Sequence, residues 1–270
     1  MHPAEPGPPQ GIGVIAPADF TLDRELWRWV PSDVALHVTR LPTCASRMTV
    51  QVAELLHDLE AVRQATQDLL TPEPAVVAYA CAAGSFVDGA AGDRVLSRTI
   101  RDAGAPAACT MSRALVDGLR LLRVNRLGIV TPYPRAMNRR LVGYLAEHGV
   151  QTVWVDGVEV LEQMWRGDTP VMDGDGAQAL FIGCTNIPTY DVLASLEEFV
   201  GKPVLTANEM LMCAALRALD RPAVAWCPRE SASDAPAASL TALGATTSAG
   251  PGLLLPELPA AIAPTAIPSG

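Results

Sequence analysis

The chain has 270 residues, of which 49% are hydrophobic and 5% aromatic, and its net charge is −9. This length allows two compact α/β lobes, each with an aliphatic core. Nucleic-acid binding needs clustered Lys and Arg to neutralise phosphates, so the acidic balance argues against a nucleic-acid partner.

The cysteine spacing and the N-terminal residues indicate the cellular compartment of the protein. The six cysteines are widely spaced, and none belongs to a C-x-x-C pair. Such spacing predicts reduced thiols rather than a disulfide framework. The first ten residues, MHPAEPGPPQ, lack the charged start and apolar core of a signal peptide, and no apolar run approaches the ~18 residues of a membrane span. We expect a cytoplasmic protein without a membrane partner.

Strand and helix patterns alternate between residues 11 and 219. The expected strands are 11–17, 34–41, 75–80, 107–109, 126–133, 150–156, 178–183 and 203–205. The expected helices are one from about 23, then 48–70, 88–103, 111–122, 134–148, one or two short helices within 158–177, 189–200 and 208–219. Strands separated by helices predict right-handed βαβ units and parallel sheets.

The order of elements repeats in outline, which predicts an α/β fold of two lobes with a cleft between them. The first lobe is expected to span 11–112 plus 206–219, and the second to span 113–205. One continuous doubly wound sheet is the alternative. Residues 1–10 and 228–270 are expected to be flexible tails, because their Pro-rich composition buries too little apolar surface to offset the entropy of ordering.

Two cysteines follow buried-looking strands at corresponding places in the repeat. Cys81 ends the run VVAYAC, and Cys184 ends ALFIGC. Parallel strands present side chains in the crevice at their carboxyl edge, so two facing edges would place one thiol on either side of a substrate. At contact distance from one reacting centre, the sulfurs would lie roughly 6 to 9 Å apart. One thiol then serves as nucleophile or base and the other as acid.

The residues after each cysteine favour chemistry over packing, although a buried Cys is more often a small hydrophobe. Ala82 to Ser85 form a small-residue turn whose amides can face an anion, and Thr185 and Asn186 follow the second thiol. We expect such amides to lower the pKa of both thiols and to bind a carboxylate. The remaining cysteines, 44, 109, 213 and 227, lack this setting and are interpreted as structural.

Further polar candidates follow two other strands. Thr131 and Tyr133 end the run RLGIVTPY at the same edge, where the phenol would donate to a carboxylate or simply cap the core. Thr110 and Ser112 are interpreted first as N-cap residues of the next helix.

Cofactor and metal motifs are missing from the sequence. The four histidines have no metal-ligand spacing, and neither a phosphate-binding loop nor a complete G-x-G-x-x-G is present. A G-x-S-x-G elbow is also lacking. We expect no metal and no cofactor.

With ACAAGS, VTPY and GCTN in view, the sequence resembles the aspartate/glutamate racemase superfamily, and within it the maleate cis–trans isomerases and arylmalonate decarboxylase. The resemblance covers about residues 11–219 and implies two flavodoxin-like lobes related by a pseudo-twofold axis. It implies that Cys81 adds to a double bond, that Cys184 supplies and recovers a proton, and that Tyr133 binds a carboxylate. Arylmalonate decarboxylase has glycine at the position of Cys81, which counts against simple decarboxylation.

Two departures concern substrate binding. The isomerases carry an asparagine after the first strand, where this chain has Asp19 or Phe20 in APADF. A second family asparagine has no counterpart before the segment 162–170. An acidic or aromatic residue in place of an amide would repel or exclude one end of a small diacid.

These observations predict a cofactor-independent isomerase of maleate or a related small unsaturated carboxylate. The alternatives are a two-base racemase of an amino acid or hydantoin, a decarboxylase of a malonate derivative, and a carboxylate-binding sensor without turnover. The resemblance favours a homodimer or homotetramer.

Overall fold

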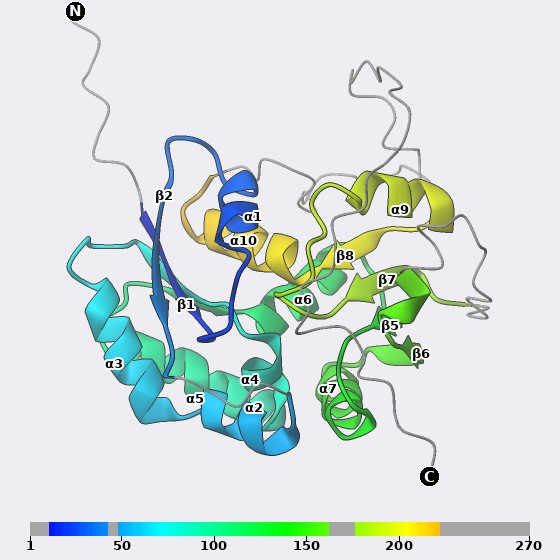
Figure 1. Ribbon diagram of the computed structural model, residues 1–270, viewed down its shortest axis with the longest axis horizontal. Coiled ribbons are helices and arrows are strands. Elements are labelled where there is room, and N and C mark those ends of the chain that lie inside the picture. The colour runs from blue at the N-terminus through cyan, green and yellow to red at the C-terminus, as the bar shows by residue number, and fades with distance from the viewer. Residues whose placement is uncertain (1–10, 43–47, 162–175, 222–270) are drawn as a thin grey trace, which may run out of the picture.

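The computed structural model describes residues 11–42, 48–161 and 176–221, and it contains two parallel four-stranded sheets. The first has the order β2-β1-β3-β4 and the second the order β6-β5-β7-β8 (Figure 1). The strands of the first sheet are β1 (Gly11–Ala16), β2 (Ala35–Arg40), β3 (Val76–Tyr79) and β4 (Ala108–Thr110). Those of the second are β5 (Arg126–Val130), β6 (Gln151–Asp156), β7 (Ala179–Ile182) and β8 (Val204–Thr206). The strand order is therefore duplicated.

Helices cover both sheets. They are α1 (Asp23–Arg28), α2 (Val50–Leu56), α3 (Leu59–Leu69), α4 (Ala82–Phe86), α5 (Gly89–Asp102), α6 (Met111–Leu121), α7 (Arg135–Glu147), α9 (Leu193–Val200) and α10 (Ala207–Ala218). In the first lobe, α3 packs on β1 and β2, and α5 packs on β4. In the second, α7 contacts β6 and α9 contacts β8, on opposite sides of the sheet in Figure 1.

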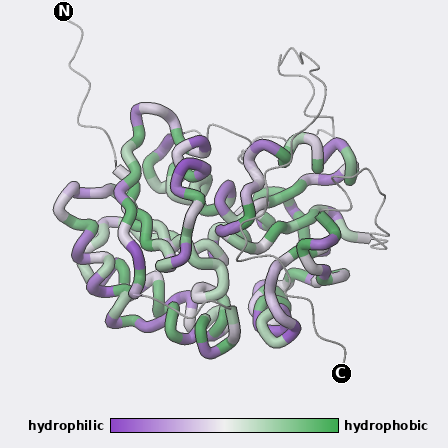
Figure 2. Tube along the Cα trace, viewed as in Figure 1, coloured by the Kyte–Doolittle hydropathy of each residue, from purple (hydrophilic) through white to green (hydrophobic). Residues whose placement is uncertain are grey.

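The central strands are apolar because both of their faces are buried. Every residue of β1, β3 and β7 is buried, whereas the edge strand β6 is only half-buried. Figure 2 shows this as hydrophobic colour along the inner strands and hydrophilic colour on the outer turns. Continuous apolar runs are the usual signature of parallel strands covered by helices.

The duplicated sheets confirm the two-lobed α/β fold, and the alternative of one continuous sheet is wrong. The helix expected over 48–70 is also wrong as a single element, because Asp58 accepts hydrogen bonds from the amides of Glu60 and Ala61 and starts a new helix. Side-chain capping of this kind ends one helix and begins another wherever the chain turns. The tails lie outside the described residues, as does most of the region expected to hold short helices within 158–177.

Several contacts join the two halves of the chain. Helix α10 follows the last strand of the second sheet, yet it contacts β3, β4 and α1 of the first lobe and packs on α6. We propose on this basis that α10 belongs with the first lobe, as the predicted division assigns it. The predicted division between 112 and 113 falls within α6, the helix that leads from the first sheet to the second.

Candidate functional site

Cys81 is held at the start of a helix that the sequence pattern does not predict. It is the N-cap residue of α4, and the amide of Gly84 donates to its sulfur at 3.4 Å. The carbonyl of Gly84 lies 2.7 Å from Nδ1 of His57, the C-cap residue of α2, so the end of α2 braces this turn. The expected small-residue turn is thus the first turn of α4, and Cys81 is 2% exposed.

Cys184 lies on an irregular segment after β7. Its sulfur accepts a hydrogen bond from the amide of Asn186 at 3.4 Å, and the side chain is half-buried. The helix expected from residue 189 begins at Leu193, so Cys184 is farther from a helix start than the sequence pattern predicts. The two thiols consequently occupy equivalent strand ends but unequal local structures.

Burial controls the ionisation of both thiols. It raises the pKa of Cys81 to about 12, although the Gly84 amide acts in the opposite direction. Burial likewise raises the pKa of Cys184 to about 11 against the Asn186 amide and the Tyr133 hydroxyl. The expectation of lowered pKa values is wrong, because the loss of solvation outweighs one weak amide hydrogen bond per sulfur. Both side chains are neutral thiols in this structure at physiological pH.

Tyr133 is fixed beside the thiols by the turn after β5. Thr131 Oγ1 donates to Asn138 Oδ1 at 2.7 Å and accepts from the Tyr133 amide at 3.3 Å, while Asn138 Nδ2 donates to the Tyr133 carbonyl at 3.1 Å. The ring also packs on Phe86 with centroids 5.9 Å apart. Burial, followed by the nearby thiols, raises the pKa of Tyr133 well above its ordinary value, so the phenol is a neutral hydrogen-bond donor.

Cys81, Cys184, Tyr133 and Asp19 form one cluster. The two thiols interact electrostatically with each other, the phenol hydrogen-bonds the Cys184 sulfur, and the charge of Asp19 acts on all three. Asp19 is exposed whereas Phe20 is 2% exposed and belongs to the core. Of the two candidates in APADF, Asp19 is therefore the one that faces the site.

Asn186 ties this cluster to the loop after β1. Its Nδ2 donates to the carbonyl of Asp19 and its Oδ1 accepts from the amide of Thr21, both at 3.1 Å. The side chain predicted to bind substrate thus joins the two lobes at the edge of the thiol cluster, and Thr185 beside it is 4% exposed.

Other predicted residues have bracing contacts. Ser85 Oγ donates to the Ala82 carbonyl at 2.8 Å, lies 2.5 Å from Ser112 Oγ and accepts from the Ser112 amide. These bonds join α4 to α6. Thr110 is the N-cap of α6 as expected, but Ser112 is not, because its amide and hydroxyl turn toward Ser85.

Two buried carboxylates hydrogen-bond the elements around the site, and the sequence did not predict either of them. Asp93 accepts from Thr110 at 2.5 Å and from the Tyr144 hydroxyl at 3.1 Å, which joins α5 to α7. Glu25 on α1 contacts Thr189 and Asn208. Carboxylates in helical patterns usually mark a solvated face, so no sequence signal distinguished either residue.

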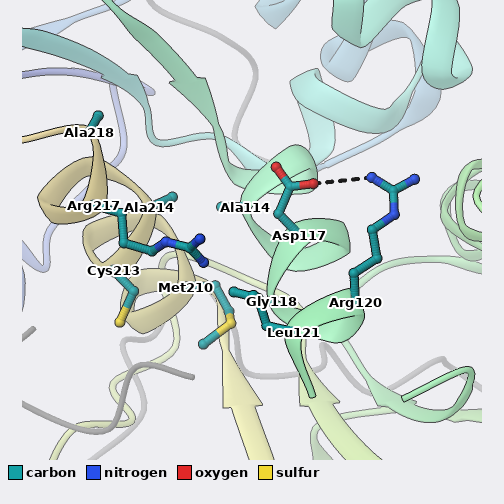
Figure 3. Close-up of a pocket in the computed structure, with 10 residues that line it drawn as sticks. All are labelled: Ala114, Asp117, Gly118, Arg120, Leu121, Met210, Cys213, Ala214, Arg217 and Ala218. Atoms are coloured by element: carbon teal, nitrogen blue, oxygen red, sulfur yellow. Dashed lines mark hydrogen bonds and ion pairs between the residues drawn. The ribbon is translucent and has the colours of Figure 1, made fainter. Parts of the chain in front are cut away.

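A cavity of about 490 Å³ lies elsewhere, between α6 and α10 (Figure 3). Its lining includes Gly118, Met210 and Cys213, and an ion pair between Asp117 and Arg120 stands beside it. Neither Cys81, Cys184 nor Tyr133 lines this cavity. Cys213 is buried in α10, whereas Cys44 and Cys227 lie outside the described residues.

Neither a candidate metal site nor a candidate membrane span occurs within residues 11–42, 48–161 and 176–221. Within these ranges, no three or more His, Cys, Asp or Glu side chains are grouped so that they could hold a metal ion. In the same ranges, every helix is too short or too polar to cross a membrane.

Comparison with known proteins identifies relatives of this chain. The family model for arylmalonate decarboxylase matches residues 47–227. The arylmalonate decarboxylase of Bordetella bronchiseptica is 30% identical over 217 residues, covering 73% of this chain and 85% of that protein. A maleate isomerase of Nocardia farcinica is 28% identical over 232 residues, covering 78% and 90%.

Among solved structures, the fold matches a mutant of the Nocardia farcinica maleate cis–trans isomerase with a covalently bound succinylcysteine intermediate. The TM-score is 0.67 at 21% identity, with 79% of this chain and 94% of that chain covered. The chain belongs to the family of arylmalonate decarboxylases and maleate isomerases, within the aspartate/glutamate racemase superfamily.

Proposed function

We propose that the protein is a cofactor-independent cis–trans isomerase of maleate or a related small unsaturated carboxylate. The observation that carries the proposal is the pair of thiols at equivalent strand ends, joined by Tyr133 in one cluster. A decarboxylase needs one proton donor, which leaves Cys81 without a task. The maleate isomerase relative, and the succinylcysteine found in a solved isomerase, support covalent addition by a thiol.

The reaction needs one thiolate and one thiol. Cys81 loses its proton to water, and its sulfur forms a bond to one alkene carbon while Cys184 transfers its proton to the other. The former double bond is now a single bond and rotates. Cys184 thiolate then takes the proton back, the carbon–carbon double bond forms again, and the bond to Cys81 breaks. The trans acid leaves, Cys184 is a thiol again, and Cys81 either adds to the next substrate as the thiolate or regains its proton from water.

Tyr133 and the turn amides bind the carboxylate in this scheme. The neutral phenol donates a hydrogen bond without adding charge, and the amides of the two Cys turns stabilise enolate character that develops during addition. Asp19 places a negative charge beside the thiols. We therefore expect substrates whose second end is neutral or cationic to bind better than a diacid, because like charges repel.

Intact-mass measurement with maleate and monocarboxylate analogues tests the proposal. Cys81 should carry the added mass of the acid, and more so in Cys184→Ala, where the proton donor is missing. Cys81→Ala and Cys184→Ala should each lose nearly all turnover, with Cys213→Ala as the matched control that keeps it.

Two other outcomes would replace the isomerase. Incorporation of deuterium from D₂O at the α-carbon of an amino acid or hydantoin, without any adduct, would establish a two-base racemase. The racemase is the second candidate because the two neutral thiols occupy equivalent positions. Saturable binding of carboxylates with neither adduct nor exchange would establish a sensor.

A further inference from the structure

The two thiols differ in what holds them in place. Cys81 belongs to the first turn of α4, so helical hydrogen bonds such as that from the Ser85 amide to the Cys81 carbonyl fix its backbone. Cys184 lies in a segment without helix or strand that runs from Gly183 to Val192. Irregular segments depend on individual side-chain hydrogen bonds for a single conformation. The Ile187 amide donates to the Cys184 carbonyl at 3.3 Å, and side-chain hydrogen bonds from the first lobe add to this backbone contact.

Glu25 of the first lobe accepts three side-chain hydrogen bonds, two from Thr189 of this segment and one from Asn208 of α10. Its Oε2 accepts from the Thr189 amide at 3.0 Å, and its Oε1 accepts from the Thr189 hydroxyl and from Asn208 Nδ2, both at 3.1 Å. All three side chains are buried, Glu25 at 7%, Thr189 at 3% and Asn208 at 1% exposure. Hydrogen bonds from neutral donors to a buried carboxylate are short-range and directional, and each is stronger than a neutral pair.

Asn208 extends this arrangement to the thiol. The same Nδ2 that contacts Glu25 also donates to the carbonyl of Thr185 at 3.0 Å, and Thr185 directly follows Cys184. Glu25 thus holds the segment at both ends, through Thr189 on one side and through Asn208 and Thr185 on the other.

We propose that Glu25 is a positioning residue for Cys184, which fixes the proton-donor thiol from the opposite lobe. The bonds from Glu25 keep Asn186 close enough to donate its amide to the sulfur, and they hold the sulfur beside Tyr133. The role in turnover rests on the proposed function, but the effect on the thiol does not, because it is measured without substrate.

Glu25→Gln is the decisive variant. Gln has the same shape, but its NH₂ group can only donate where a carboxylate oxygen now accepts. In one orientation the NH₂ group faces the Thr189 amide, and in the other it faces the Thr189 hydroxyl and Asn208. The segment then loosens and water reaches the sulfur, which relieves the burial that keeps Cys184 unreactive. We expect iodoacetamide to alkylate Cys184 at least about fivefold faster than in the native protein, since one bond to a charged group is worth roughly tenfold in an equilibrium. Peptide mass spectrometry reads Cys184 and Cys81 in the same sample, and Cys81 should change less than about twofold.

Asp23→Asn is the matched control. It makes the same carboxylate-to-amide change on the same helix and removes an exposed ion pair with Arg40 within the first lobe, so neither thiol should change. Equal rates for Cys184 in folded Glu25→Gln and native protein would overturn the proposal, as would parallel acceleration of both thiols. If Glu25→Gln does not fold, Thr189→Val removes one of the three bonds alone, and an unchanged Cys184 rate in that variant also overturns the proposal. Where maleate or an analogue is turned over, kcat should fall in Glu25→Gln with KM nearly constant. If the labelling without substrate shows no faster alkylation of Cys184 relative to Cys81, the positioning role is refuted. If the native protein and every variant are inactive, only the proposed function is refuted.

Discussion

The reactivity of the two thiols toward an alkylating reagent should rise steeply with pH and stay far below that of an ordinary cysteine. The ordinary pKa is 9.0, whereas burial raises that of Cys81 to about 12 and that of Cys184 to about 11. At pH 8 the reactive thiolate is then roughly one molecule in 10,000 at Cys81 and one in 1,000 at Cys184. Each further pH unit should increase both rates about tenfold without a plateau up to pH 9.5.

Iodoacetamide labelling followed by peptide mass spectrometry measures each site separately. From these pKa values alone Cys184 should react about tenfold faster than Cys81, and its greater exposure adds to the difference. A plateau below pH 9 at either thiol would refute the reasoning, because it would show a thiolate that burial does not suppress. Faster labelling of Cys81 than of Cys184 would refute the conclusion that Cys81 is the more deeply buried thiol with the higher pKa.

The same pKa values have a consequence for stability. Both thiols bind their protons more tightly in the folded chain than in the unfolded one, so the free energy of unfolding should decrease as pH rises above 9. Urea unfolding at pH 8 and 9.5 measures the decrease, which should be smaller when either thiol is replaced by Ala.

Four substitutions test the charge beside the thiols and the packing of the helices. Asp19→Asn should lower KM for maleate about tenfold and accelerate alkylation of both thiols, because Asp19 raises their pKa values; unchanged thiol rates would contradict its place in the cluster. Gly84→Ala should cost about 1–3 kcal/mol in urea unfolding, because its Cβ would collide with the Tyr79 hydroxyl. Gly143→Ala, which has no atom within 4 Å of the new Cβ, should instead stabilise α7 by up to about 1 kcal/mol. If Gly84→Ala and Gly143→Ala change the free energy of unfolding equally, the packing around Gly84 is not tight. Burial raises the Asp93 pKa, so the native protein should lose stability relative to Asp93→Asn as pH rises from 4.5 to 7.5 and the tightly held proton is given up. If the difference in free energy of unfolding between the two proteins is constant across this range, the pKa of Asp93 is not raised.

The sequence alone determined the fold class and the equivalent positions of the two thiols. Parallel strands buried on both faces require continuous apolar runs, and such runs stand out in ALFIGC and VVAYAC. The duplicated order of the sheets follows from the repeat of these runs and of the helices between them. Cys81, Cys184 and Tyr133 could be chosen because parallel strands place their carboxyl ends at one edge.

Only the tertiary structure decided the charge state of the thiols and what holds them. The sign of a pKa shift is a balance between desolvation and hydrogen bonding, and burial at a junction of two lobes is not visible in the residues beside Cys81. The contacts of Glu25 with Thr189 and Asn208 join positions more than 160 residues apart in the chain. Local sequence determines local periodicity, but a buried carboxylate on a short helix gains its partners only when distant segments pack against it.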